Sequence, residues 1–498
     1  MFDLPQFAEG IYLTYFLLAL AAFLALSAVF SLRKTEYILY GLLIWFPFET
    51  IALRYSSSEY YAIIKYFPEV LVYGTLLISW REYYKRTRRY FPSTPLNKYL
   101  AAFFLVAVIS LVLNWYNPGI WFLGIRQLFR FVLIFIIFIL EDYSTPVIKN
   151  FLKIGMAIIL GESVLALIQA LSGGILDKYL FFSDSITLGP LEYDGIQQNW
   201  APGQRVFATM GRYDRLGSLL AIGLVMLFPW YYVLKKGDQR DKWWIVFFLG
   251  LAALILTYSR ASWIAFVAGM FTIGFFLMHD RKLFRVLSAG GFLLTGYLLF
   301  AIVTSSLGTA SLDLNRRQSL RDRLVETVSI YSWQQSYEGY GRFFFIVNTP
   351  LTVVREYPFF GVGPGNYGGG VAAALDNRRV YNILHLPFGI QNVYGQIDNN
   401  WLSIWGEFGS LGLVIWVMIF TTIYRSSYFV QNRSEDILQR TVAQGLCGAT
   451  VSLTVLGFFG PYFEFRTLMV YYWLLVGIVM YYFRGHRFSW NLLREEKL

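Results

Sequence analysis

The stretch QIDNNWLSIWGEFGSLG, residues 396–412, begins with polar residues and passes into an apolar run typical of a membrane helix. Before it lies RFFFIVNTPLTVVREYPFFGVGPGNYGGG, residues 342–370, within a long polar segment. Any chemistry that these two stretches carry therefore sits where a membrane meets water. We expect the other apolar segments of the chain to support them.

The composition indicates the class of protein. Of 498 residues, 56% are apolar, 19% are aromatic and only 15% are charged, which is too apolar for a soluble domain of this length. A bilayer core of about 30 Å is crossed by roughly 20 apolar residues in a helix, and the chain supplies many such runs between short charged turns. The ten-residue alternating strands of a membrane barrel are not what the pattern indicates. We predict an all-α polytopic membrane protein.

The hydropathy pattern predicts thirteen spanning helices and three parts of the chain. The first part, 1–304, holds ten helices, 305–398 is a large external loop, and 399–498 holds three helices and a tail. The thirteen spans are expected at 11–32, 36–54, 62–80, 97–114, 121–140, 147–171, 213–234, 242–258, 260–278, 283–304, 399–424, 440–460 and 465–484.

The orientation follows from the short basic loops, because Lys and Arg accumulate on the cytoplasmic side. Such loops fall on one side of the predicted topology, at 81–90, 235–242, 279–285, 425–440 and from 484 onward. The N-terminus is then outside and the C-terminus cytoplasmic. The chain start lacks the basic region of a cleaved signal peptide. The net charge of +11 reflects this topology and not a nucleic-acid partner.

Two segments on the outer side, 172–212 and 305–398, are too long to be mere connections and are rich in aromatic residues and glycine. Arginine outnumbers lysine on this side, where the lysines are Lys65 and Lys178. A planar guanidinium binds phosphate oxygens with two parallel bonds, so the set indicates a phosphate-bearing ligand. Solvated side chains or contacts with lipid headgroups are the plainer alternative. The arginines are Arg205, Arg212, Arg215, Arg260, Arg316, Arg317, Arg321, Arg323, Arg342, Arg355, Arg378, Arg379 and Arg466.

Arg126 and Arg130 are four residues apart and share one face of the helix expected at 121–140. A charge at that depth costs a few kcal/mol unless it is paired or faces water, so both should face the protein interior. Glu162 and Glu407 are candidate partners. A structural ion pair and a ligand role are equally compatible with this pattern.

The glycines Gly363, Gly365 and Gly368 form a GxGxxG pattern. A dinucleotide fold needs this pattern between a strand and a helix of a soluble α/β unit, which an exported loop does not provide. We expect instead a tight turn that lets backbone N–H groups approach a ligand. The external loops contain no DxD pair for a metal–nucleotide, and the single cysteine, Cys447, excludes an intramolecular disulfide.

Four motifs, in this order, resemble the superfamily of O-antigen ligases and Wzy-type O-antigen polymerases. They are RVFATMGRYDRLGSLLAIGL (205–224), TYSRASWIAFVAG (257–269), Arg342 followed by PFFGVGPGNY (358–367), and DNNWLSIWGEFGSLG (398–412). The resemblance implies a membrane glycosyltransferase that moves a glycan from a polyprenyl diphosphate carrier to an acceptor hydroxyl. It also implies that no metal and no other cofactor takes part.

By this resemblance Arg205, Arg260 and Arg342 match the arginines that would bind the carrier diphosphate. A departing diphosphate gains negative charge in the transition state, and fixed guanidinium groups aimed at it lower the barrier. Further substrate contacts are expected from Arg212, Arg215, Gly363, Gly365, Asn399 and Glu407.

The chain departs from the ligases of this family at one position. Where they carry His-Asn before the helix that re-enters the membrane, this chain has Asp398-Asn399. Asp398 is the candidate base for the acceptor hydroxyl, and His385, thirteen residues earlier, is the alternative. The change favours a polymerase over a lipid A ligase.

The remaining alternative is a transporter of anions or of the same lipid-linked glycan. Transport sites usually lie at the bilayer midplane and often between inverted repeats, whereas these arginines gather outside and the chain shows no repeat. The expected partners are the lipid-linked glycan donor, a glycan acceptor, membrane lipids and, for a polymerase, a chain-length regulator protein.

Overall fold

The computed structural model describes residues 34–56, 58–180, 186–188, 191–193, 203–233, 238–279, 281, 285 and 330–495. The helix expected at 11–32 lies outside these ranges, and of the one expected at 283–304 they include only Arg285. The boundary at 304/305 also lies outside them, so the division of the chain into three parts stays a prediction.

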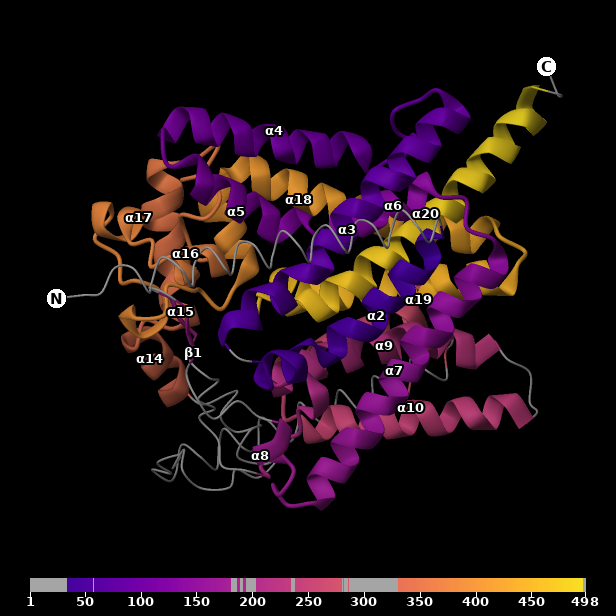
Figure 1. Cartoon of the computed structure of the whole chain (residues 1–498), viewed down its shortest axis with the longest axis horizontal. Helices are drawn as coiled ribbons and strands as arrows, with labels where there is room; N and C mark the ends of the chain where they lie inside the picture. The colour runs from indigo at the N-terminus through magenta and orange to yellow at the C-terminus, as the bar shows by residue number, and fades with distance from the viewer. Residues whose placement is uncertain are drawn as a thin grey trace.

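The described chain is helical apart from one short hairpin, in which β1 (Ile186–Leu188) pairs antiparallel with β2 (Leu191–Tyr193). The remaining expected spans all correspond to helices (Figure 1). They are α2 (Thr35–Arg54), α3 (Ser58–Thr87), α4 (Asn97–Asn114), α5 (Pro118–Phe129) with α6 (Val132–Leu140), α7 (Thr145–Leu171), α9 (Tyr213–Val233), α10 (Asp238–Leu256), α11 (Arg260–Phe271) with a π-helical extension (Thr272–Leu277), α18 (Asn400–Arg433), α19 (Ile437–Leu456) and α20 (Arg466–Glu495).

Within the described ranges, seven helices are long and apolar enough to cross a membrane, or eight if α5 and α6 count as one span. The chain is therefore an all-α multi-pass membrane protein, while the count of thirteen stays a prediction. The central helix α19 shows why length and hydropathy undercount. Most of its side chains are buried against other helices, so it needs little apolar surface toward lipid and carries Gln444, Thr450 and Ser452 inside.

Small residues bring the central helices close together. A Cβ atom on Gly445 of α19 would lie 2.9 Å from Sδ of Met226 in α9, and one on Gly448 would lie 2.7 Å from Val225. The Ser452 hydroxyl donates to the Ala265 carbonyl of α11 at 2.8 Å. Close backbone approach at small residues is a common way for membrane helices to associate.

The span expected at 121–140 is not one straight helix. It is divided into α5 and α6, which are bent by 60° at Arg130 and Phe131. The sequence prediction of a single helix is wrong here, because the helix is interrupted at these two residues. The bend places Arg126 and Arg130 against a carboxylate of α3, which is described below.

The described part of the second long segment, 330–398, forms a small helical lobe at one end of the bundle, away from the C-terminal end of α20 (Figure 1). Its helices are α14 (Ile330–Glu338), α15 (Arg342–Asn348) with a π-helical extension (Thr349–Val354), α16 (Gly370–Ala374) and α17 (Arg379–Ile383). A separate apolar cluster holds it together, built around Phe345, Tyr367, Tyr381, Phe388 and Ile397. The lobe thus presents Arg342, the first residue of α15, to the end of the bundle.

Candidate active site

The turn between α19 and α20, residues 457–466, joins three distant parts of the chain. The Gly457 carbonyl accepts from the backbone N–H of Asn400 at 2.8 Å, and the Phe459 carbonyl accepts from the Arg342 guanidinium at 2.8 Å. Glu464 accepts from the side chains of Gln127 at 2.6 Å and Asn400 at 3.3 Å. The sequence analysis missed this turn except for Arg466. Its only signal was the pair of charges in PYFEFR (461–466) at the start of an apolar run.

Arg342 holds the residue that precedes α18. Its Nε donates to the Asp398 carbonyl at 2.9 Å, and its Nη2 lies 3.9 Å from Oδ2 of the same residue. The guanidinium also lies over the Phe459 ring, 5.4 Å from the centroid. The structure therefore brings together Arg342, which is predicted to bind the diphosphate, and Asp398, the predicted base.

Arg212 and Asp214 lie near Arg342 and Asp398, and these four residues are called the arginine cluster below. The Arg212 guanidinium makes two bonds of 3.0 Å to the Asp214 carboxylate. Loss of hydration raises the pKa of the Asp398 carboxyl above its ordinary value, while Arg342 and Arg212 act to lower it. The Asp214 charge, and to a smaller extent Asp398, raise the pKa of Arg212. Asp214 was not singled out in the sequence, although it stands between two predicted site residues in GRYDR (211–215).

Arg205 lies in a loop that α7 anchors. Gln169 of α7 accepts from the backbone N–H groups of Phe207 at 3.0 Å and Ala208 at 2.9 Å, and Glu162 accepts from that of Thr209 at 3.1 Å. The buried Arg205 guanidinium lies over the Tyr213 ring, 4.2 Å from the centroid. Since Tyr213 directly follows Arg212, Arg205 lies close to the cluster.

Arg260 and Arg215 lie nearby on α11 and α9. The backbone N–H of Val206 donates to the Leu256 carbonyl at 3.3 Å, which brings the Arg205 loop to the end of α10, four residues before Arg260. Arg215 lies over the Phe465 ring at 5.6 Å. The convergence of Arg260 with Arg342 stays a prediction.

The glycine motif wraps around a break in α18. Gly409 has φ of +66°, and a Cβ on Gly361 would meet the backbone of Gly406 and Glu407. The loop donates across the break, from Val362 N–H to the Gly406 carbonyl at 2.9 Å and from Gly363 N–H to the Glu407 carbonyl at 2.8 Å. These contacts hold the re-entering helix in two segments.

The expected tight turn is present, since Gly363 and Gly365 have φ of +95° and +80°. However, the Gly365 N–H donates to the buried Glu407 carboxylate at 2.8 Å, as does the Tyr367 N–H at 3.2 Å. The backbone groups expected to meet a ligand are bonded within the protein. Ligand roles for Gly363, Gly365 and Glu407 stay predictions, and the proposal below does not use them.

Asn399 and His385 both mark helix ends. The buried Asn399 side chain caps α18 by accepting from the Leu402 N–H at 3.1 Å. His385 ends α17 in the left-handed conformation, with φ of +52°, and the following N–H of Leu386 donates back to the Tyr381 carbonyl at 2.9 Å. His385 is exposed, and among the residues that the structure describes it makes no recorded contact with Asp398. Of the two candidate bases, the structure places Asp398 beside the arginines.

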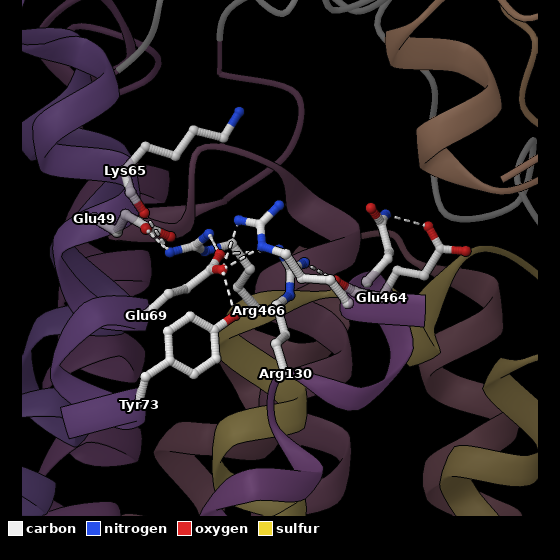
Figure 2. A network of polar contacts seen from close by, with 9 residues as sticks. Glu49, Lys65, Glu69, Tyr73, Arg130, Glu464 and Arg466 are labelled. Carbon is white, nitrogen blue, oxygen red and sulfur yellow. Dashed lines mark hydrogen bonds and ion pairs between the residues drawn. The ribbon is translucent and has the colours of Figure 1, made fainter. Parts of the chain in front are cut away.

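A second charged network lies beside the cluster and corrects another expectation (Figure 2). Glu69 of α3 is 3% exposed and binds Arg126 at 2.5 Å, Arg130 at 3.3 Å and Arg466 at 2.6 Å. Arg466 also binds Glu49 of α2 at 2.7 Å. The partner of Arg126 and Arg130 is therefore Glu69. Glu162 and Glu407, named as their candidate partners, instead bind the backbone of the Arg205 loop and the glycine loop.

Comparison with known families identifies the region that holds most of these residues. Residues 245–417 match the model of a family described as O-Antigen ligase. The chain therefore contains an O-antigen ligase domain, which supports the superfamily of O-antigen ligases and polymerases. The matched domain contains Arg260, Arg342 and Asp398, whereas Arg205, Arg212 and the 457–466 turn lie outside it. No curated protein matches the chain.

This domain supports, in general terms, a glycosyltransferase activity of the O-antigen ligase or polymerase type, and the family implies a lipid-linked glycan and an acceptor as substrates. Among the residues that the structure describes, no group of three or more His, Cys, Asp or Glu side chains is placed so that it could hold a metal ion. The charged groups that do gather are arginines around two aspartates, Asp214 and Asp398, an arrangement suited to an anionic leaving group and a proton acceptor.

Proposed function

We propose that this protein polymerises a glycan at the outer face of a bacterial inner membrane, using a polyprenyl diphosphate-linked glycan as both donor and acceptor. The observation that carries the proposal is the arrangement of Asp398 beside Arg342 and Arg212, with its carboxylate 3.9 Å from Nη2 of Arg342. Neither a metal nor another cofactor is needed for the steps below.

In the proposed reaction the acceptor hydroxyl attacks the anomeric carbon of the donor glycan. The bond between that carbon and the diphosphate oxygen breaks, and the diphosphate leaves on its polyprenyl chain. The hydroxyl proton passes to the Asp398 carboxylate. Arg342 and Arg212, with Arg205 and Arg260 as further predicted ligands, stabilise the charge that develops on the diphosphate.

An apolar groove of about 740 Å³ supports the lipid part of this proposal. It begins at Asn399 and Ile346, next to Asp398 and on the same helix as Arg342, and it follows α18 and α19 through residues such as Trp401, Val417 and Thr454. A polyprenyl chain in this groove would leave its diphosphate at the arginine cluster.

The choice of polymerase over ligase rests on Asp398, which stands where the resembling ligases carry histidine. The experiment supplies the purified protein with lipid-linked glycan alone. A polymerase elongates it, because one molecule serves as the acceptor for another, and a chain-length regulator protein would change only the length distribution. A ligase gives no product until a separate acceptor is added, and that result would contradict the proposal.

A further inference from the structure

A second cavity, of about 370 Å³, lies among α7, α9, α19 and α20. Its lining is almost wholly apolar and includes Phe151, Met156, Ile222, Trp230, Val442 and Leu475. The cavity opens to the surface of the helix bundle, and its volume is more than twice the roughly 150 Å³ of an apolar cavity that takes up benzene. Such a lining offers too few polar partners to hold water, so its natural occupant is apolar.

Two basic side chains line the same cavity. Lys149 and Lys153 are one turn apart on α7, and both are exposed. Neither forms an ion pair with any residue in the described ranges. The cavity therefore combines an apolar interior with two positive charges available to an anion.

The position of these lysines along α7 decides which face of the membrane they occupy. Gln169, near the other end of α7, binds the loop that carries Arg205. Lys149 and Gln169 are twenty residues apart, which corresponds to about 30 Å of helix, the thickness of a bilayer core. The lysines thus lie at the face opposite the active site.

We propose that this cavity holds an acyl chain of an anionic glycerophospholipid whose phosphate binds Lys149 and Lys153. Basic side chains at a membrane surface attract anionic headgroups, and the apolar interior suits a hydrocarbon chain. The polyprenyl carrier does not fit the same position, since its diphosphate would then lie at the membrane face opposite the active site, about the thickness of a bilayer core away. The assignment does not depend on the proposed glycan polymerisation.

The glycines of α7 offer a matched pair of variants. Gly155 lines the cavity, and a Cβ there meets no atom within 4 Å, so Gly155→Phe places a ring in the cavity without a clash at the Cβ. Gly161, six residues further along α7, is exposed, lies outside the cavity lining and also has no atom within 4 Å. Gly161→Phe is therefore the control for the added aromatic side chain.

The experiment measures the thermal unfolding midpoint of the purified full chain in detergent with added dioleoylphosphatidylglycerol or dioleoylphosphatidylcholine. A lipid present at about tenfold above its dissociation constant should raise the midpoint by about 2–4 °C. Phosphatidylglycerol should give the larger rise in the wild type and in Gly161→Phe, and none in Gly155→Phe. In the variant carrying Lys149→Gln and Lys153→Gln the two lipids should act equally.

Equal effects of the two lipids on the wild type would overturn the proposal, as would a full phosphatidylglycerol effect in Gly155→Phe. A rise with polyprenyl phosphate alone that disappears in Gly155→Phe would assign the cavity to the carrier and also overturn it. Counting bound lipids by native mass spectrometry gives a second measurement for any variant whose unfolding transition is too broad.

Discussion

Arg342 binds Asp398 through the backbone and not through the carboxylate. Its Nε donates to the Asp398 carbonyl at 2.9 Å, while the nearest carboxylate oxygen lies 3.9 Å from Nη2. The guanidinium therefore fixes the position of the residue without occupying the carboxylate. The Asp398 side chain is 45% exposed, so its carboxylate stays available to an incoming hydroxyl.

The first prediction concerns the base. Asp398→Asn keeps the shape of the side chain but cannot take a proton, so kcat should fall by about 10²–10⁴-fold with little change in donor binding. The measurement is elongation of lipid-linked glycan, with donor affinity determined separately. His385→Gln is the matched control and should be nearly silent. Normal turnover of Asp398→Asn together with an inactive His385→Gln would assign the base to His385.

The second prediction concerns the pH dependence. A base acts only when deprotonated, so kcat/KM should fall as the pH drops through the pKa of Asp398, which is raised above the ordinary aspartate value. Arg212 lowers that pKa, and Arg212→Gln should therefore move the acid side of the profile to higher pH. A profile of kcat/KM against pH for both proteins checks this. An unchanged or lower midpoint would argue against Asp398 as the titrating group.

The third prediction separates charge from geometry at Arg342. This guanidinium binds the carbonyl groups of Asp398 and Phe459 at once, which a single ammonium on a flexible chain cannot reproduce. Arg342→Lys should lose about 10²–10³-fold in kcat, close to the loss in Arg342→Ala. Transfer assays in membranes with matched protein levels measure it. Full activity of the lysine variant would leave no role for the two carbonyl contacts.

The fourth prediction concerns stability. Glu69→Gln removes a negative charge from three guanidinium groups that are 10–17% exposed, and the loss of such a buried partner costs about 3–5 kcal/mol. The apparent unfolding temperature in detergent should fall clearly. Glu82→Gln breaks the exposed pair with Lys85, which is worth about 0–1 kcal/mol, and serves as the control. Equal behaviour of the two variants would mean that the Glu69 network contributes little.

The fifth prediction tests the orientation in the membrane. Because Cys447, the one cysteine of the chain, is buried, single cysteines introduced elsewhere can be followed by thiol labelling. Ala374→Cys, on the exposed side of α16, should react from outside the cell, and Glu435→Cys, between α18 and α19, only after permeabilisation. The reverse pattern would place the arginine cluster in the cytoplasm and refute the proposed function.

The hydrophobic pattern predicts individual spans well, because burial in a bilayer depends mainly on length and composition. The span expected at 97–114 matches α4 residue for residue. The pattern does not predict where a span breaks. Next to the bend between α5 and α6, Arg126 binds Glu69, more than fifty residues earlier, and next to the break at Gly409 the helix accepts bonds from the loop at 361–363.

The site could be predicted in part, because its arginines stand in recognisable motifs. Arg342 and Asp398 were both named from the sequence, and the structure places them in contact. The supporting groups were missed, because Asp214 and Phe459 belong to no pattern of spacing. The glycine motif predicted the tight turn, while the ligand contact expected of it stays a prediction. The Gly365 N–H donates to the Glu407 carboxylate, and no local sequence signal distinguishes that carboxylate from an external anion.

The turn at 457–466 has a consequence for the order in which the protein is made. Its carbonyl groups bind Arg342 and Asn400, and its final arginine binds Glu49 and Glu69 near the start of the chain. During synthesis, the contacts between the arginine cluster and this turn cannot form until residues more than a hundred positions after Arg342 have left the ribosome. A nascent chain stopped before Gly457 would hold every predicted catalytic residue and still lack the carbonyl groups that bind Arg342 and Asn400, so we expect the site to be completed only when the late helices have entered the membrane.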